Sequence, residues 1–164
     1  APVRESLKEA VRLSLTADEA TLQKFIEHTR GLFNKMEPED IAFPRSVNGL
    51  AKYTSRADIY GKGTPMHVRG ALMYNHLLEK HNLSMKYEAI QEGEKIKFLY
   101  LKEPNTIREN CIGFIGKIPK ELDIHRYVDY NTMFNKSFLE PLKQIVEGIG
   151  WNTEPVATLE SMFG

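Results

Sequence analysis

The sequence has 164 residues, of which 41% are hydrophobic and 27% are charged. This composition is that of an ordinary globular protein, long enough to bury a core as one domain with or without a sub-domain. It excludes a low-complexity chain, and no apolar run approaches the roughly 18 residues that a membrane span requires. No apolar segment of a secretory signal peptide follows the first residues.

Cys111 is the only cysteine, so the chain cannot build a disulfide framework and a reducing compartment fits best. We therefore expect a cytoplasmic protein. A catalytic Cys111 needs a base partner that the sequence does not indicate, so a buried structural thiol is the simpler reading. The first residue is Ala1 rather than Met, and we expect a processed product or an excised fragment.

The net charge is zero, but the charges are unevenly spread along the chain. Residues 1–42 carry a net charge of −2, residues 43–102 carry +5, and residues 103–164 carry −3. A basic middle between acidic flanks is typical of a polyanion-binding sub-domain on a neutral scaffold, although chance clustering gives the same numbers.

The first third of the chain predicts two helices. Apolar residues recur at helical spacing in the first, at Val3, Leu7, Val11 and Leu15. Thr16-Ala17-Asp18-Glu19 has the form of a capping box, with Thr16 as the N-cap of the second helix. We expect that helix to end near Asn34. Its apolar side consists of Ala20, Leu22, Phe25, Ile26, Leu32 and Phe33.

The middle of the chain predicts a small sheet and one helix. Residues 40–44 indicate a short strand that Pro44 confines to a sheet edge, and residues 45–65 are irregular and rich in turn-forming residues. Thr64 and Pro65 suit the N-cap and first position of a helix running to about Lys80. Residues 95–101 and 112–115 predict two further, neighbouring strands.

The last third predicts a helix from Tyr130 to about Gly148, with Asp129 as its N-cap and a kink or break at Pro141. Its apolar face consists of Met133, Phe134, Phe138, Leu142, Ile145, Val146 and Ile149. We therefore expect an α+β fold, with a mainly helical base formed by both chain ends and a small basic sub-domain inserted between them. The predicted domain covers residues 1–156, with base segments 1–39 and 120–150, insertion 40–119, and a tail at 157–164.

Five cations lie within 25 residues in the middle of the chain, with Asp58 as the one opposing carboxylate; they are Arg45, Lys52, Arg56, Lys62 and Arg69. Small polar residues and glycines between them expose backbone N–H groups, and a helix N-terminus follows. Phosphate backbones are bound by this mixture. The alternative is a solvated loop with scattered charges.

Catalytic patterns are weak in this sequence. No histidine pairs with another ligand at a zinc spacing, and Gly61-Lys62-Gly63-Thr64 lacks the upstream glycine of a nucleotide-binding loop. No Asp-x-Asp lies on an apolar strand, as two-metal phosphoryl transfer needs. An enzyme that uses His67, Arg69 or Cys111 is therefore the least favoured reading.

The chain ends in Leu-x-x-Met-Phe after a polar connector. One helical turn places Leu159, Met162 and Phe163 on one side as anchors for a hydrophobic groove of a partner. The alternative is that this tail packs on its own domain.

Several segments resemble the thumb domain and C-terminal tail of family B DNA polymerases, specifically the replicative polymerases of T-even-type bacteriophages. The segments are Asn48-Gly49-Leu50-Ala51-Lys52-Tyr53, Pro65-Met66-His67-Val68-Arg69-Gly70, Glu92-Gly93-Glu94-Lys95-Ile96, Lys136-Ser137-Phe138-Leu139-Glu140-Pro141-Leu142 and the tail. The second of these is the most specific match, and the resemblance covers essentially the whole chain.

The resemblance implies a thumb that grips the primer–template duplex by its backbone. The residues it assigns to DNA are Arg45, Asn48, Lys52, Tyr53, Lys62, His67, Arg69, Lys95 and Lys136. The tail anchors Leu159, Met162 and Phe163 are assigned to the sliding clamp, which gives processivity through effective concentration. The exonuclease, fingers and palm are missing, and with them the catalytic carboxylates and the Mg²⁺ that they hold.

We therefore expect a DNA-replication protein of a phage-infected bacterial host that is inactive alone, with no catalytic residues, metal or cofactor of its own. Its expected partners are duplex DNA, the sliding clamp, and the portion of the polymerase that contains the palm and the exonuclease. The chain is expected to be either a fragment excised from that polymerase or one product of a split polymerase gene. The alternative function is a stand-alone nucleic-acid-binding protein without a polymerase partner.

Overall fold

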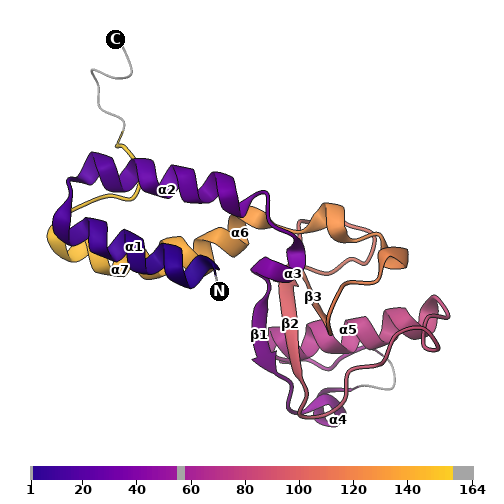
Figure 1. Cartoon of the computed structure of the whole chain (residues 1–164). Helices are drawn as coiled ribbons and strands as arrows, with labels where there is room; N and C mark the ends of the chain where they lie inside the picture. Colours follow the sequence, from indigo (N-terminus) through magenta and orange to yellow (C-terminus); the bar gives the residue numbers. More distant parts are fainter. Residues whose placement is uncertain (1, 55–57, 157–164) are drawn as a thin grey trace. The chain divides into compact units, whose positions relative to one another are not determined.

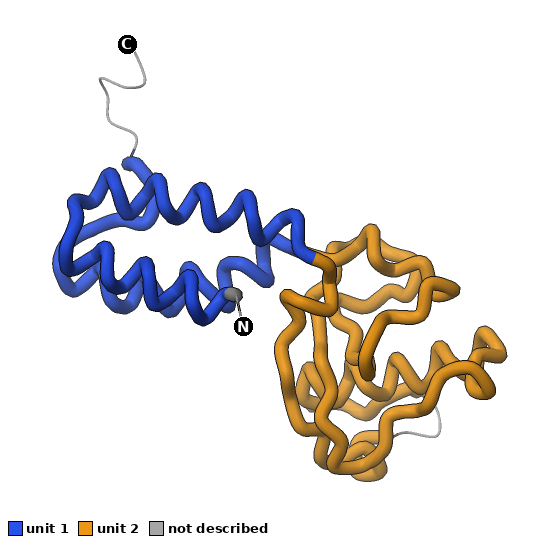
Figure 2. Tube along the Cα trace, viewed as in Figure 1, with its two compact units in different colours: residues 1–36, 130–164 blue, residues 37–129 orange. Residues whose placement is uncertain are grey.

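The computed structural model describes residues 2–54 and 58–156, and the chain divides into two compact units (Figures 1 and 2). Unit 1 combines the chain up to residue 36 with the residues from 130 onward, and unit 2 is the segment 37–129. The helices and one three-stranded antiparallel sheet confirm the predicted α+β class. Among the described residues, no helix combines the length and the apolar character needed to cross a bilayer.

Unit 1 is helical. Its elements are α1 (Pro2–Thr16), α2 (Glu19–Phe33), α6 (Tyr130–Phe134), the π-helical turn η3 (Asn135–Leu139), α7 (Glu140–Val146) and the 3-10 turn η4 (Glu147–Ile149). Helix α2 runs back along α1, and α7 lies beside α1 (Figure 1). Aromatic rings fill its core: Phe33 meets Phe134 edge-on at 5.2 Å, and Phe134 stacks on Phe138 at 4.9 Å. Segments from the two ends of the chain therefore share one core.

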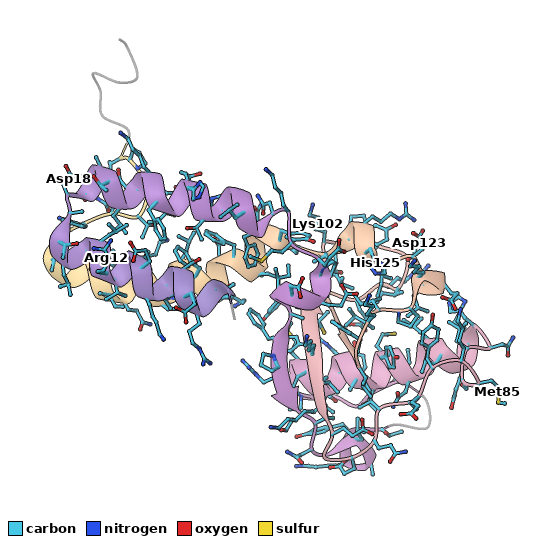
Figure 3. All side chains as sticks on the ribbon, viewed as in Figure 1. Arg12, Asp18, Met85, Lys102, Asp123 and His125 are labelled. Carbon is cyan, nitrogen blue, oxygen red and sulfur yellow. The ribbon has the colours of Figure 1, made fainter. Side chains whose placement is uncertain are left out.

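The turn between α1 and α2 differs from the predicted capping box. The N-cap of α2 is Asp18 (Figure 3), whose Oδ1 accepts the N–H of Thr21 at 2.8 Å. The Thr16 hydroxyl instead donates to the carbonyl of Arg12 at 2.9 Å, inside α1. A shorter turn is possible because a carboxylate caps as well as a hydroxyl does, so the prediction of Thr16 was wrong by two residues.

Several residues predicted on the apolar faces of these helices are exposed; they are Leu15, Ala20, Leu32, Ile145 and Ile149. Leu15, for example, is 78% exposed. The prediction was wrong for them because the stripe that meets a neighbouring helix is narrower than the apolar pattern in the sequence.

The predicted distortion of the last helix is found at η3, immediately before Pro141. Pro141 has no N–H to donate to the carbonyl of Ser137, and its ring pushes that carbonyl away. The Ser137 hydroxyl itself donates to the carbonyl of Met133 at 2.7 Å. The helical segment ends where Gly150 takes a φ of +77°, a left-handed conformation that suits glycine.

Unit 2 is built on a sheet of order β1-β2-β3, covered on one face by α5. The elements are α3 (Pro38–Ile41), β1 (Phe43–Ser46), α4 (Leu50–Tyr53), α5 (Met66–Lys80), β2 (Lys95–Tyr100), β3 (Cys111–Phe114) and the 3-10 turns η1 (Lys120–Leu122) and η2 (His125–Tyr127). A Cβ on Gly70 of α5 would meet the backbone nitrogen of Gly113 on β3 at 2.8 Å. The two glycines therefore let the helix approach the strand at backbone distance.

The three predicted strands are present, and β1 is the edge strand that Pro44 requires. Residues 40 and 41, however, belong to α3, because Pro38 opens a helical turn there. The N-cap of α5 is Pro65 rather than Thr64. The Thr64 hydroxyl donates to the carbonyl of Gly61 at 2.6 Å and so closes the preceding turn.

Candidate nucleic-acid interface

The predicted DNA-binding residues fall mainly on unit 2, in the segment 43–64 and at the start of α5. We call residues 43–64 the basic loop. Its first half leads from the edge strand β1 into the short helix α4, and Gly49 makes the turn with a φ of +95°. Its second half returns to α5, and residues 55–57, which include Arg56, lie outside the described residues.

A carboxylate from elsewhere in the chain holds the turn at Gly49. Glu92 accepts the backbone N–H of Gly49 at 2.5 Å and that of Leu50 at 2.8 Å. Backbone bonds join the same two segments, from Val47 N–H to the Glu94 carbonyl and from Gly93 N–H to the Val47 carbonyl. The N–H groups of Gly49 and Leu50 therefore donate to a carboxylate of the protein and are not left to bind a phosphate.

Lys52 and Tyr53 lie together on α4. The Nζ of Lys52, an exposed residue, lies 5.1 Å from the centroid of the Tyr53 ring. The carbonyl of Tyr53 accepts the N–H of Gly61 at 2.6 Å, which closes the loop at its neck. Asn48 and Lys62 are exposed on either side of this neck.

Arg45 and His67 lie between the sheet edge and the start of α5. Arg45 is paired with Ile96 across the sheet, and its guanidinium lies over the rings of Phe43 and Phe98 at 6.0 and 5.7 Å. Burial lowers the pKa of His67, and the charge of Arg45 lowers it further. A lowered pKa favours the neutral imidazole of His67, so Arg45 carries the positive charge at this place.

Arg69 is held by the protein's own groups. Its Nη2 donates to Oδ1 of Asn110 at 2.6 Å, and its Nε lies 3.7 Å from a carboxylate oxygen of Glu109. Nε is buried without a hydrogen-bond partner among the described residues. The guanidinium also lies 5.8 Å from the Tyr60 ring. With only 24% of its side chain exposed, Arg69 is placed to brace the loop, and its contact with DNA stays a prediction.

Tyr60 completes this cluster by donating its hydroxyl to Glu109 at 2.5 Å. Burial and then this hydrogen bond raise the pKa of Tyr60 to about 12. Cys111 lies at the same place, where burial raises the pKa of its thiol against the effect of Arg69. A buried thiol with a raised pKa is a poor nucleophile, as the structural reading of Cys111 implies.

Two further predicted DNA-binding residues belong to other elements. Lys95 is exposed at the start of β2, opposite Ser46 of the basic loop. Lys136 belongs to η3 in unit 1. Leu159, Met162 and Phe163 lie outside the described residues. No group of three or more His, Cys, Asp or Glu side chains in residues 2–54 and 58–156 could hold a metal ion.

The sequence reasoning missed the residues that organise the loop, namely Glu92, Tyr60 and Glu109. The carboxylate of Glu92, an exposed residue, accepts two backbone N–H groups. Their partners lie 40 or more residues away in the sequence. No local pattern predicts such pairs, because they exist only once the sheet has formed.

Comparison with models of known protein families finds no match. The chain is 30% identical over 166 aligned residues to the DNA-directed DNA polymerase of Enterobacteria phage T4, and 31% identical over 166 to that of Escherichia phage RB69. These alignments cover 99% and 98% of this chain but 18% of each polymerase. A tRNA modification GTPase MnmE of Nitrosomonas eutropha is 22% identical over 111 residues, which is 64% of this chain and 24% of that protein.

The chain thus spans less than a fifth of the length of the polymerases that it matches. The two polymerase matches run along nearly all of it, whereas the GTPase match covers a smaller part at lower identity. Over nearly its whole length, the chain is therefore similar to one portion of the DNA-directed DNA polymerases of these two phages, which confirms the family resemblance carried by its motifs.

Proposed function

We propose that this chain is the thumb portion of a family B phage DNA polymerase, and that unit 2 grips the backbone of the primer–template duplex. One observation carries the proposal: the exposed cations of the basic loop and of β2 have no carboxylate at ion-pair distance within the described residues. They are Arg45, Lys52, Lys62 and Lys95.

The frame beneath these cations is fixed by the protein's own groups. The carboxylate of Glu92 accepts the N–H groups of Gly49 and Leu50. Tyr60 of the loop and Arg69 of α5 both contact the carboxylate of Glu109, which lies just before β3. A loop ordered in advance has less conformational entropy to lose when it binds. Lysine side chains on such a frame contact phosphates without reading bases, as a grip that slides along any sequence requires.

The test is duplex affinity measured by fluorescence anisotropy on a labelled primer–template. In a Lys52→Gln, Lys62→Gln double variant we expect weaker binding and a salt slope reduced by about 2, since each phosphate contact contributes about 0.9 to the slope. The matched control is Lys24→Gln with Lys35→Gln, which removes the same charge from exposed residues of unit 1. Equal losses in both variants would show a diffuse charge effect and refute the site.

The tail extends the proposal to a second partner, the sliding clamp, with Leu159, Met162 and Phe163 as anchors. This part rests on the sequence, since residues 157–164 lie outside those described. Calorimetric titration of the cognate clamp with the chain and with a Phe163→Ala variant tests it. We expect binding to be lost in the variant while duplex affinity is retained. Clamp binding by neither protein would leave a nucleic-acid grip without a clamp partner.

A further inference from the structure

Unit 2 contains a cavity that the proposed duplex grip does not use. It has a volume of about 540 Å³ and lies between the second half of α5, the segment before β3 and the residue after η1. Its lining includes the apolar side chains of Ile59, Met73, Leu77, Ile107 and Leu122. This volume is in the range of small-ligand sites, which combine an apolar lining with a few polar groups.

The same cavity is lined by cationic and imidazole side chains, from His76, Lys80, His81 and Arg108. None of these four has a carboxylate at ion-pair distance among the residues that the structure describes. The one carboxylate of the lining, Asp123 (Figure 3), is paired with Arg126 at 3.1 Å. The cavity therefore has an excess of positive charge that an anionic ligand would balance.

The segment that carries Arg108 is held in place by Asn105. The Asn105 amide donates to the carbonyls of Lys102 and Glu109 at 2.8 and 2.6 Å, and its Oδ1 accepts the N–H of Ile107 at 3.1 Å. Arg108 has a φ of +56°, which is unfavourable for an arginine. The protein thus tolerates backbone strain at the residue that brings a guanidinium to the cavity, and such strain is often kept for binding.

The cavity is adjacent to the basic loop. Ile59 lines it and also lines a second cavity, of about 430 Å³, together with Lys62 and Glu109. Ile59 belongs to the basic loop, so an anion in the larger cavity would lie against the loop that we propose to hold phosphates. Nucleic-acid chemistry thus fits it better than an acidic peptide does.

We propose that this cavity binds a nucleoside phosphate, with the base against Ile59, Leu77 and Ile107 and the phosphate at Lys80 and Arg108. The ligand is either a free nucleotide or one nucleotide of a single DNA strand. The choice of a nucleotide as the ligand rests on the proposed duplex grip, while the cavity itself uses none of the residues assigned to the duplex.

The test is an NMR titration of the full chain with three probes: thymidine 5′-monophosphate, a short oligothymidylate and inorganic phosphate. We expect saturable shifts at the amides of residues 76–81 and 106–108 with the first or second probe. If the natural ligand is a DNA strand, the oligothymidylate should bind much more tightly than thymidine 5′-monophosphate. If it is a free nucleotide, the two probes should bind with similar affinities. Equal binding of inorganic phosphate would overturn the nucleoside assignment, and so would tighter binding of a Glu-rich peptide, which is titrated as a fourth probe.

The variant that removes the charge is Lys80→Gln with Arg108→Asn. Glutamine keeps the helix propensity at 80, and asparagine tolerates the positive φ at 108, so the fold is retained. We expect at least a roughly tenfold loss of nucleotide affinity, against no loss in a Lys35→Gln, Lys117→Gln control. An unchanged affinity refutes the site. In parallel, duplex binding by the Lys52→Gln, Lys62→Gln variant separates a failure of this proposal from a failure of the duplex grip.

Discussion

The two units use some of their carboxylates differently. In unit 1, the carboxylates of Glu5, Glu9 and Glu27 each pair with a cation three residues later on the same helix (Figure 3 marks Arg12). In unit 2, the carboxylates of Glu92 and Glu109 bind backbone, tyrosine and arginine groups inside the frame. Lys52 and Lys62, which are exposed on the basic loop, have no carboxylate at ion-pair distance among the residues that the structure describes. Paired charges solubilise a helix, whereas unpaired cations on an ordered frame attract a polyanion.

The largest effect is expected from a substitution that separates α5 from β3 in unit 2. Gly70→Ala places a Cβ 2.8 Å from the backbone of Gly113, which cannot move without shifting β3. We expect a loss of about 1–3 kcal/mol in the free energy of unfolding together with weaker duplex binding, measured by denaturation and anisotropy.

Gly31→Ala is the matched control on α2, where, apart from the helix's own nearby backbone, no atom of the described residues lies within 4 Å of the added Cβ. The same substitution should there stabilise the chain by about 0.5–1 kcal/mol, because alanine favours helix. Equal effects at the two glycines would contradict the close approach of α5 and β3.

The next effect concerns Glu92. Glu92→Ala leaves the N–H groups of Gly49 and Leu50 without their acceptor, at a cost of about 1–3 kcal/mol. Faster hydrogen exchange at these two amides is the measurement. Glu94→Ala, on the neighbouring turn, is the control, and unchanged protection at Gly49 would show that the carboxylate does not order the loop.

A smaller effect is expected from Tyr60→Phe, which removes one hydrogen bond worth about 1 kcal/mol. The pKa of Tyr60 is raised to about 12 in the folded chain, so its protonated form favours folding. That contribution is complete below the ordinary pKa near 10 and is lost as the pH rises toward about 12. The alkaline fall in stability should therefore be smaller in Tyr60→Phe, and identical pH profiles of the two proteins would argue against the bond to Glu109.

The smallest effect is expected in unit 1. Glu5→Gln breaks an exposed pair with Lys8 whose atoms lie 3.6 Å apart, and such pairs contribute less than about 0.5 kcal/mol. We expect unfolding and duplex affinity to stay within error of the parent chain. A clear change in affinity would mean that unit 1 also contributes to the electrostatic grip.

Much of the fold could be predicted from the sequence because its signals are local. Apolar spacing indicated both N-terminal helices, Thr64 and Pro65 indicated the start of α5, and Pro44 indicated an edge strand. Caps were less predictable, since Thr16 and Asp18 both suit an N-cap and only the length of the turn decides between them.

The candidate site was predictable in its residue types and not in its organisation. Arg69 follows the loop closely in the sequence and has the chemistry of a phosphate contact, yet its partners Glu109 and Asn110 come from the segment before β3. Which carboxylate reaches an arginine depends on how the strands are paired. That information is long-range and lies in the topology.

The π-helical turn η3 shows where this gene can change in length. A turn of this kind holds one residue more than the α-helical repeat and absorbs it locally, so the helices on either side keep their phase. Deleting one codon within η3 would therefore shorten the wide turn toward a regular α-helix and leave Leu142 and Val146 on the buried side of α7. Deleting one codon from α7 instead would rotate the residues beyond it by about 100° around the helix, away from the core.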